Sequence, residues 1–338
     1  MSTKQRNLGE ILQEFSQHRL VMQQELQKII IGQNEVIEQM FAAIFTRGHC
    51  LLEGVPGLAK TLMVSTLAQI LDVGFKRIQF TPDLMPSDIT GTNVLEEDER
   101  GKRSFRFMEG PIFTNILLAD EINRTPPKTQ AALLQAMQER EVSVGRQTYE
   151  LPDPFFTIAT QNPIEQEGTY PLPEAQMDRF LMQIYINYPD EPSEIEVIRL
   201  VRGEEGQGVA PKKEQEKVTI AQQHIFEARS QIYEIHVSDA IEKYIMDLIT
   251  ATRQPERYGE DLKKWIHIGA SPRGGIGLDK CSRVHAWLQS RDYVTPDDVR
   301  EVVNDVLRHR IMLSYEANAE GITSDQVIAE IVKKVAVA

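Results

Sequence analysis

Short apolar runs alternate with amphipathic stretches through the first half of the chain. The runs cover 49–54, 77–81, 115–121, 155–161 and 180–186. Such nearly continuous runs are typical of strands that are buried on both faces of a sheet. The stretches between them, such as 61–71, have apolar residues at helical spacing. The pattern therefore predicts an α/β domain, in which helices cover both sides of a parallel sheet.

Helical spacing also marks the start of the chain and its second half. The apolar residues that predict one or two N-terminal amphipathic helices are Leu8, Ile11, Leu12, Phe15, Leu26, Ile29 and Ile30. Residues 202–217 are charged and poor in apolar side chains, and beyond them Ser271 and Thr295, each followed by proline, are typical helix N-caps. We expect an α/β domain with its N-terminal helices at 1–188, a linker region at 189–216 and a helical domain at 217–338.

Two segments interrupt the α/β pattern, at 82–107 and 142–150, and both predict hairpins that project from the sheet. Apolar residues in the first segment, Met85, Phe105 and Phe107, either pack within the hairpins or touch a client molecule, and packing is the commoner role. The first segment also carries the basic residues Arg100, Lys102, Arg103 and Arg106. We interpret them as a solvated hairpin face, with a nucleic-acid contact as the alternative.

Composition narrows the class of protein. The chain has 338 residues, of which 41% are hydrophobic and 26% charged, which is ordinary for a globular protein. It has no apolar run near the roughly 18 residues of a membrane span. Cys50 and Cys281 lie far apart, so we expect reduced core thiols and a cytoplasmic protein. The net charge of −13 disfavours a surface that grips nucleic-acid phosphates.

Residues 54–61 nearly spell a phosphate-binding loop, with the sequence GVPGLAKT. They follow an apolar strand and precede a helix, which is the context that such a loop requires. Backbone amides and the helix N-terminus would point at the phosphates, while Lys60 reaches the outer phosphates and the Thr61 hydroxyl ligates magnesium. Ala59 stands where the general pattern has glycine. Because it directly precedes the helix, we expect a negative φ there, which tolerates a methyl group.

Polar residues end two of the other apolar strands. Asp120 and Glu121 follow the third strand, and we expect the pleat to point them to opposite sides, Asp120 toward the magnesium shell and Glu121 toward the attacking water. The alternative is a strand end that simply meets solvent. Asn162 follows the next strand, where its amide can orient the water and sense the γ-phosphate. Taken alone, an asparagine before proline is a turn former.

Taken together, these segments resemble the AAA+ ATPases and specifically the MoxR family. The resemblance rests on the ordered series GVPGLAKT, LLADEINR, ATQNP, PLPEAQMDRF and GASPRG, and it covers nearly the whole chain. It implies a five-stranded sheet of order 5-1-4-3-2 in a P-loop domain, followed by a C-terminal all-α lid. Alanine is the usual residue of that family at the place of Ala59, so its presence is no sign of a decayed loop.

The resemblance also implies a set of site residues for ATP and Mg²⁺. The predicted nucleotide contacts are Ile31, Gly32, Gly54, Val55, Pro56, Gly57, Leu58, Ala59, Lys60, Thr61, Leu62, Asp120 and Arg273. Arg179 matches the arginine finger, which acts on the ATP of a neighbouring subunit, although a surface ion pair with Asp178 is the plain alternative. Arg273 matches the lid's sensor arginine. A finger given by a neighbour implies a ring, which in this family suggests a hexamer.

The function that the resemblance implies is an ATPase ring that remodels or activates protein partners, among them proteins with von Willebrand factor A domains. A nucleic-acid motor is an alternative, and so is the motor subunit of a magnesium chelatase. A scaffold that binds ATP without hydrolysing it is disfavoured, because it has no use for the set Lys60, Asp120, Glu121, Asn162, Arg179 and Arg273. We expect neither a nucleic-acid partner nor a membrane span.

Overall fold

The computed structural model of the protein describes residues 32–55, 57–97, 101, 103–162, 168–196, 199 and 222–337. The predicted N-terminal helices, most of the predicted linker, and Ile31 and Pro56 of the nucleotide contacts lie outside these residues. Within the described part of the chain, no helix is both long and apolar enough to cross a bilayer.

Five parallel strands form the main sheet, as the apolar runs predict. They are β1 (Cys50–Gly54), β2 (Phe75–Gln79), β5 (Ile116–Asp120), β8 (Phe156–Gln161) and β9 (Met182–Ile186). Their order across the sheet is β2-β5-β8-β1-β9. These labels differ from the predicted order because they also count four hairpin strands. Numbered alone, the five strands read 2-3-4-1-5 from one edge, which is 5-1-4-3-2 from the other.

Helices cover both faces of this sheet, which explains why its inner strands are mostly apolar. On one face, Cys50 and Leu52 of β1 pack with α2 (Asn34–Phe45) and α3 (Lys60–Ile70). On the other, Leu51 packs in a second cluster with α5 (Pro127–Glu139). Because neighbouring residues of a strand point to opposite faces, the inner strands β1, β5 and β8 supply both clusters and need apolar residues at most positions. The edge strand β2 is largely exposed and carries charged residues.

The second half of the chain is mainly helical, as predicted. Its helices are α8 (Gln222–Glu234), α9 (Asp239–Arg253), α10 (Glu260–Trp265), α11 (Pro272–Leu288), α12 (Pro296–Leu307), α13 (Tyr315–Ala319) and α14 (Ser324–Lys334). Ser271 and Thr295 are the N-caps of α11 and α12, as their sequences indicate. The short strands β10 (Ile266–Ile268) and β11 (Met312–Leu313) pair antiparallel, a feature that the all-α prediction lacks.

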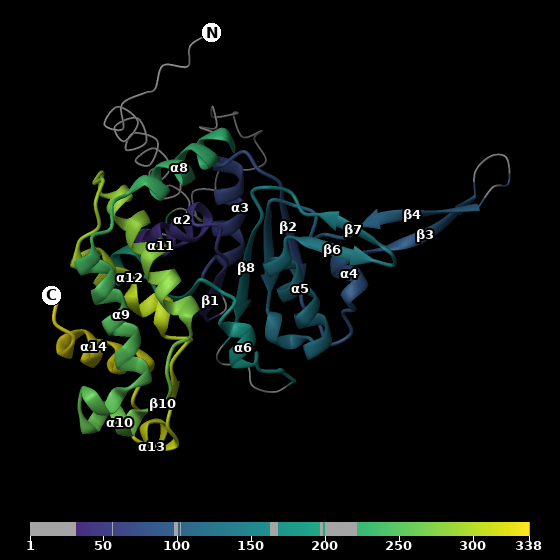
Figure 1. Cartoon of the computed structure of the whole chain (residues 1–338). Coiled ribbons are helices and arrows are strands. Elements are labelled where there is room, and N and C mark those ends of the chain that lie inside the picture. Colours follow the sequence, from purple (N-terminus) through teal and green to yellow (C-terminus); the bar gives the residue numbers. More distant parts are fainter. Residues whose placement is uncertain are drawn as a thin grey trace, which may run out of the picture.

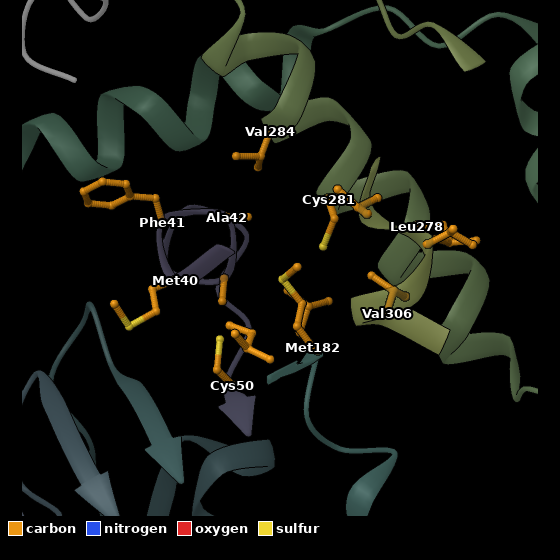
Figure 2. Packing of buried hydrophobic residues seen from close by; sticks show 14 of the residues in the cluster. Met40, Phe41, Ala42, Cys50, Met182, Leu278, Cys281, Val284 and Val306 are labelled. Carbon is orange, nitrogen blue, oxygen red and sulfur yellow. The ribbon is translucent and has the colours of Figure 1, made fainter. Parts of the chain in front are cut away.

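The helical domain shares its core with the sheet domain. Figure 2 shows Ala42 of α2 and Cys50 of β1 on the side of the sheet domain that faces Cys281 and Val284 of α11. One cluster of buried side chains runs through all these elements. Both cysteines are buried and free, which agrees with the expected reduced thiols, and burial raises their pKa. The two domains are therefore joined by packing and not only by a connecting chain.

Two antiparallel hairpins project from the side of the sheet away from the helical domain (Figure 1). They are β3 (Gly91–Glu97) with β4 (Arg103–Glu109), and β6 (Glu141–Val144) with β7 (Gln147–Glu150). Both predicted insertions are thus confirmed as hairpins. Short helical turns complete the domain: α4 (Pro86–Thr90), η1 (Ile122–Arg124) and α6 (Glu174–Met177), with η2 (Pro255–Arg257) in the helical domain.

The hairpin residues divide between the two roles that the sequence left open. Phe107 packs within the hairpins, because its ring stacks on Tyr149 with centroids 4.0 Å apart. Phe105 does not pack in this way and is 75% exposed, and Met85 on α4 is exposed as well. Arg103 and Arg106 form ion pairs with Glu97 and Glu96 across the hairpin. These pairs support the interpretation of a solvated hairpin face.

His49 is a fully buried hydrogen-bonding group at the start of β1. Its Nδ1 accepts a hydrogen bond from the Thr157 amide at 3.0 Å, so the proton sits on Nε2, which donates to the Met137 carbonyl at 3.1 Å. Burial lowers the pKa of His49 to about 4, although the bond to Met137 opposes the shift. The ring joins α5 to β8 in its neutral form.

This burial predicts a pH dependence of stability. Between pH 6.5 and about 4, His49 is protonated in the unfolded chain but not in the fold, so the free energy of unfolding decreases as the pH falls through that window. The shift corresponds to about 3 kcal/mol. We expect His49→Gln to reduce the slope of the free energy of unfolding against pH by the equivalent of about one bound proton. Urea titrations at several pH values measure this slope. His267→Gln, at an exposed ring, is the control and should keep the wild-type slope.

Candidate nucleotide site

The carboxyl ends of β1, β5 and β8 lie side by side at one edge of the sheet. The strands are parallel, and Glu53 of β1 is level with Gln161 of β8, while Ala119 of β5 is level with Ala159. This register brings residues 54–61, Asp120, Glu121 and Asn162 to the same edge. In open α/β sheets, ligands bind outside the carboxyl ends of the strands. The topology therefore places the predicted segments at one edge of the sheet.

The predicted phosphate loop connects β1 to α3, which begins at Lys60. The Lys60 ammonium folds back over the loop and donates to the Gly54 carbonyl. Burial lowers the pKa of Lys60, while Asp120, Glu53 and Glu121 oppose that shift. Among the described residues, Lys60 makes no ion pair, so its charge is held at the loop by a neutral acceptor. Thr61 lies half-buried in the first turn of α3.

The prediction of a negative φ at Ala59 is wrong. Ala59 has φ +51° and ψ +26°, in the left-handed region. The helix starts only at Lys60, and the residue before it must turn the chain from the loop into the helix, as the N-cap position does. Gly57 is also left-handed, with φ +91°. A residue other than glycine costs roughly 1–2 kcal/mol of conformational free energy in this region. The backbone at Ala59 is therefore strained.

Gly54 is required for a different reason. A Cβ atom built on Gly54 would lie 2.7 Å from the Ile186 carbonyl oxygen on β9. The clash is with backbone, so no side-chain adjustment relieves it. Glycine therefore lets the loop leave β1 directly against the neighbouring strand.

Asp120 and Glu121 do not divide as the pleat predicts. Glu121 has already left the strand, with φ +57°. Asp120 accepts hydrogen bonds from Arg77, the shorter at 2.6 Å, and from the Thr160 hydroxyl at 2.5 Å. The same hydroxyl accepts the Glu121 amide at 2.8 Å. One threonine thus orients both acids, which the sequence pattern gave no reason to single out.

The Glu121 carboxylate is held by one of its two oxygens. Oε2 accepts from Gln79 at 2.8 Å and forms an ion pair with Arg124 at 2.9 Å. Oε1 has no hydrogen-bond partner among the described residues. The arrangement fixes the carboxylate while leaving one oxygen to receive a proton from an outside group. Asn162 is buried at the end of β8, next to this pair of acids in the sheet order.

Gly32 lies at the same edge, beyond the end of β9. A Cβ atom on Gly32 would lie 3.0 Å from the Ser193 side chain, and its φ is +79°. The neighbouring Gln33 donates to the Asn187 carbonyl at 2.9 Å. A cavity of about 230 Å³ adjoins these residues and continues to Asp305 and Arg308 of the helical domain. The predicted contact Gly32 therefore lies at a polar hollow beside the loop edge.

Arg179 and Arg273 lie at the opposite edge. The Leu181 amide bonds to the His49 carbonyl at 2.8 Å, so residues 178–181 enter β9 level with the start of β1. The loop follows the far end of β1, about 13 Å away at the usual rise per strand residue. The Arg273 guanidinium also lies at this amino edge, because it donates hydrogen bonds to the Asp178 carbonyl and to the Gln138 side chain, both at 3.5 Å.

The plain alternative for Arg179, an ion pair with Asp178, is wrong. The Asp178 carboxylate instead pairs with Arg310 at 2.9 Å and accepts the Ser271 hydroxyl. Arg179 makes no ion pair within the described ranges of the chain. Sequence reasoning missed Arg310, because a cationic residue after a helix is usually exposed, and here its side chain is only 2% exposed.

Comparisons with known proteins agree with this geometry. Residues 49–182 match the family described as "ATPase family associated with various cellular activities (AAA)", and residues 262–331 match an AAA lid domain. The chain is 45% identical to Chaperone MoxR1 of Mycobacterium tuberculosis, over 92% of this chain and 80% of that protein. It is 33% identical to Protein MoxR of Methylorubrum extorquens, over 91% and 92%. A crystal structure of a Cytophaga hutchinsonii protein, 45% identical, superposes with a TM-score of 0.88 and covers 97% of each chain.

The left-handed backbone at Ala59 predicts the response of the loop to substitution. Ala59→Gly relieves strain but gives the unfolded chain more freedom, so the free energy of unfolding should change by less than about 1 kcal/mol. We expect this variant to bind ATP as the wild type does. Ala59→Val puts a β-branched residue where such residues are outliers, and we expect binding of a fluorescent ATP analogue to weaken about tenfold or more. Equal affinities of the two variants would contradict the need for a left-handed residue.

Proposed function

We propose that this chain, which belongs to the MoxR family of AAA+ ATPases, binds ATP with Mg²⁺ at the carboxyl edge of its sheet and hydrolyses it in a ring of its own copies. The observation that carries the proposal is the division of charged groups between the two edges. Lys60 and the acids lie at one edge, and Arg179 lies at the other. A complete hydrolytic site then needs two subunits.

The residues at the carboxyl edge fit ATP. The amides of residues 57–59 directly precede α3, whose N-terminus favours negative charge. Lys60 carries an ammonium group whose acceptor, the Gly54 carbonyl, is neutral and can be exchanged for a phosphate oxygen. Gly32 and the polar hollow beside it offer room next to the loop for the rest of the nucleotide. These features support phosphate binding at residues 54–62.

The oxygen ligands at this edge also fit Mg²⁺. The Thr61 hydroxyl lies in the first turn of α3, and the Asp120 carboxylate lies at the end of β5. Magnesium at nucleotide sites usually takes one or two protein ligands and completes its shell with phosphates and water. When bound, the ion offsets the negative charge of the phosphate oxygens. Thr160 and Arg77 would hold the Asp120 carboxylate in place for this role.

Glu121 is the group that we assign to the attacking water. Its Oε2 is fixed by Gln79 and Arg124, while Oε1 remains to accept a hydrogen bond from water. Asn162, on the adjacent strand, would supply a neutral amide that orients the same water without adding charge. A carboxylate that positions and polarises water is a recurring part of such sites.

Arg179 and Arg273 would act on the nucleotide of a neighbouring subunit. Both approach the amino edge of the sheet, so neither reaches phosphates at the carboxyl edge of its own subunit in this arrangement. Head-to-tail contacts between copies bring these two edges together, and such contacts form a ring when the rotation between copies closes. The family suggests six copies. Arg179, which has no ion pair in the described part of the chain, would offset charge in the transition state.

The work done by hydrolysis would be the remodelling or activation of protein partners. The similarity to Chaperone MoxR1 supports this class, and partners with von Willebrand factor A domains are our expectation. The buried free cysteines agree with a cytoplasmic setting. A nucleic-acid motor is disfavoured by the net charge of −13 and by the ion pairs that neutralise Arg103 and Arg106. The chelatase alternative has no specific observation in its favour.

Hydrolysis between subunits predicts complementation. Glu121→Gln should lose about 10²–10⁴ in kcat, and Arg179→Ala about 10³–10⁵, each with ATP affinity within a few fold of wild type. Mixed rings of the two variants should regain ATPase activity, because sites on Arg179→Ala subunits receive fingers from their Glu121→Gln neighbours. Arg257→Ala, which removes an exposed arginine of the helical domain, is the control. Normal hydrolysis by Arg179→Ala alone would remove the finger assignment.

The class of client can be tested with the Glu121→Gln variant, which should bind ATP but hydrolyse it very slowly. With ATP bound, Glu121→Gln should hold its clients, so affinity capture followed by mass spectrometry should recover proteins. We expect DNA to leave the ATPase rate of the wild type unchanged. Recovery of nucleic acid in place of protein, or stimulation of the ATPase by DNA, would favour the motor alternative.

A further inference from the structure

The backbone that carries Arg179 is held by a buried arginine of the helical domain. Arg310 lies three residues beyond the end of α12, and its side chain is 2% exposed. Nε donates to the Asp178 carboxylate at 2.9 Å. Nη2 donates to the carbonyls of Asp178 and Phe180 at 3.3 and 2.6 Å. Nη1 donates to the Leu181 carbonyl at 3.0 Å and to that of Val306.

This set of contacts uses the full capacity of the guanidinium group. Arginine has five N–H donors in a fixed plane, and Arg310 has five bonds to acceptors. Taking an ion out of water costs several kcal/mol unless its hydrogen bonds are replaced, so the positions of these acceptors are tightly specified. Four of the five acceptors belong to residues 178–181.

Arg179 lies within the segment that is held in this way. The carbonyls on either side of it, those of Asp178 and Phe180, both accept from Arg310. Two further residues of the helical domain add to the restraint, because Ser271 donates to the Asp178 carboxylate and His309 bonds to the Phe180 carbonyl. The backbone of Arg179 is thus fixed from the helical domain, while its side chain makes no ion pair among the described residues.

We propose that Arg310 is a positioning residue for Arg179, so that the helical domain of one subunit sets how the arginine is presented to the ATP of its neighbour. The inference rests on the proposed function, because it requires Arg179 to act between subunits. A shift of α12 against β9 moves the Arg310 side chain, and the carbonyls of residues 178–181 follow it. Hydrolysis in one subunit then depends on the lid of the next.

The test compares Arg310→Lys with Arg229→Lys. Lysine keeps the positive charge but lacks the planar fork, so it cannot serve five acceptors. Arg229 on α8 is the matched control: its side chain is 9% exposed, and it also ties the helical domain to the sheet domain, through the Ile44 carbonyl of α2 at 2.9 Å and an ion pair with Asp153 at 3.2 Å. These partners belong neither to the nucleotide site nor to residues 178–181. Both variants should lose stability, and only Arg310→Lys should lose finger function.

For Arg310→Lys we expect kcat to fall about a hundredfold, a loss that displacement of a catalytic group by about 1 Å can cause. The KM for ATP should stay within about twofold, and mixing with Glu121→Gln should restore ATPase activity, because the neighbour's finger is intact. Arg229→Lys should keep its kcat at a temperature where both variants are folded. Asp178→Asn, which retains the side-chain shape, is a milder second variant and should give the Arg310→Lys pattern in weaker form.

Three outcomes overturn the proposal. Wild-type kcat in both Arg310→Lys and Asp178→Asn would show that the finger needs no such restraint. In the second outcome, mixing with Glu121→Gln restores the ATPase activity of Arg179→Ala but not that of Arg310→Lys. This result would show that Arg310 supports its own subunit's site or fold. An equal loss in Arg229→Lys would reduce the effect to stability. If Arg179→Ala itself is not complemented, the proposed function fails first.

Discussion

The parallel alignment of five strands is the constraint on which the rest of the structure depends. Because every strand of the main sheet runs the same way, the loop after β1, the acids after β5 and Asn162 after β8 meet at one edge. The same alignment sends the start of β9, with Arg179, to the other edge. Separation of these groups by the length of β1 follows directly from this geometry. A site that needs both sets has to be completed by a second copy.

Much of this arrangement can be predicted from the sequence. The apolar runs predict the five strands, because a strand covered on both faces has little room for polar residues. The caps Ser271 and Thr295 and both hairpins are also readable, since turns and helix starts use local chemistry. These features depend on residues close together in the chain, where sequence patterns carry most information.

The backbone of the site was not predictable in the same way. Ala59 and Glu121 both adopt left-handed conformations, and neither residue type favours them. Each residue lies where the chain turns sharply, Glu121 off a strand and Ala59 into a helix. The left-handed conformation is therefore required by the path of the chain and by the direction in which the loop amides and the Glu121 carboxylate point. Strain of this kind tends to gather at functional sites. The burial of Arg308 and Arg310 could not be predicted for a related reason, because the carbonyls and carboxylates that accept their hydrogen bonds are brought together only by the fold.

The shared core limits how the helical domain can transmit a signal. One apolar cluster runs from α2 through β9 to α11 and α12, so a wide hinge opening would expose it to water. Packed interfaces of this kind favour small shifts of one element past another. A small shift is enough to move residues 178–181, because every donor of the Arg310 guanidinium is already bonded. Movement of Arg310 must therefore either break a hydrogen bond or carry its acceptors along. The burial that makes the two domains one body therefore also makes the Arg179 segment responsive to slight movement of α12.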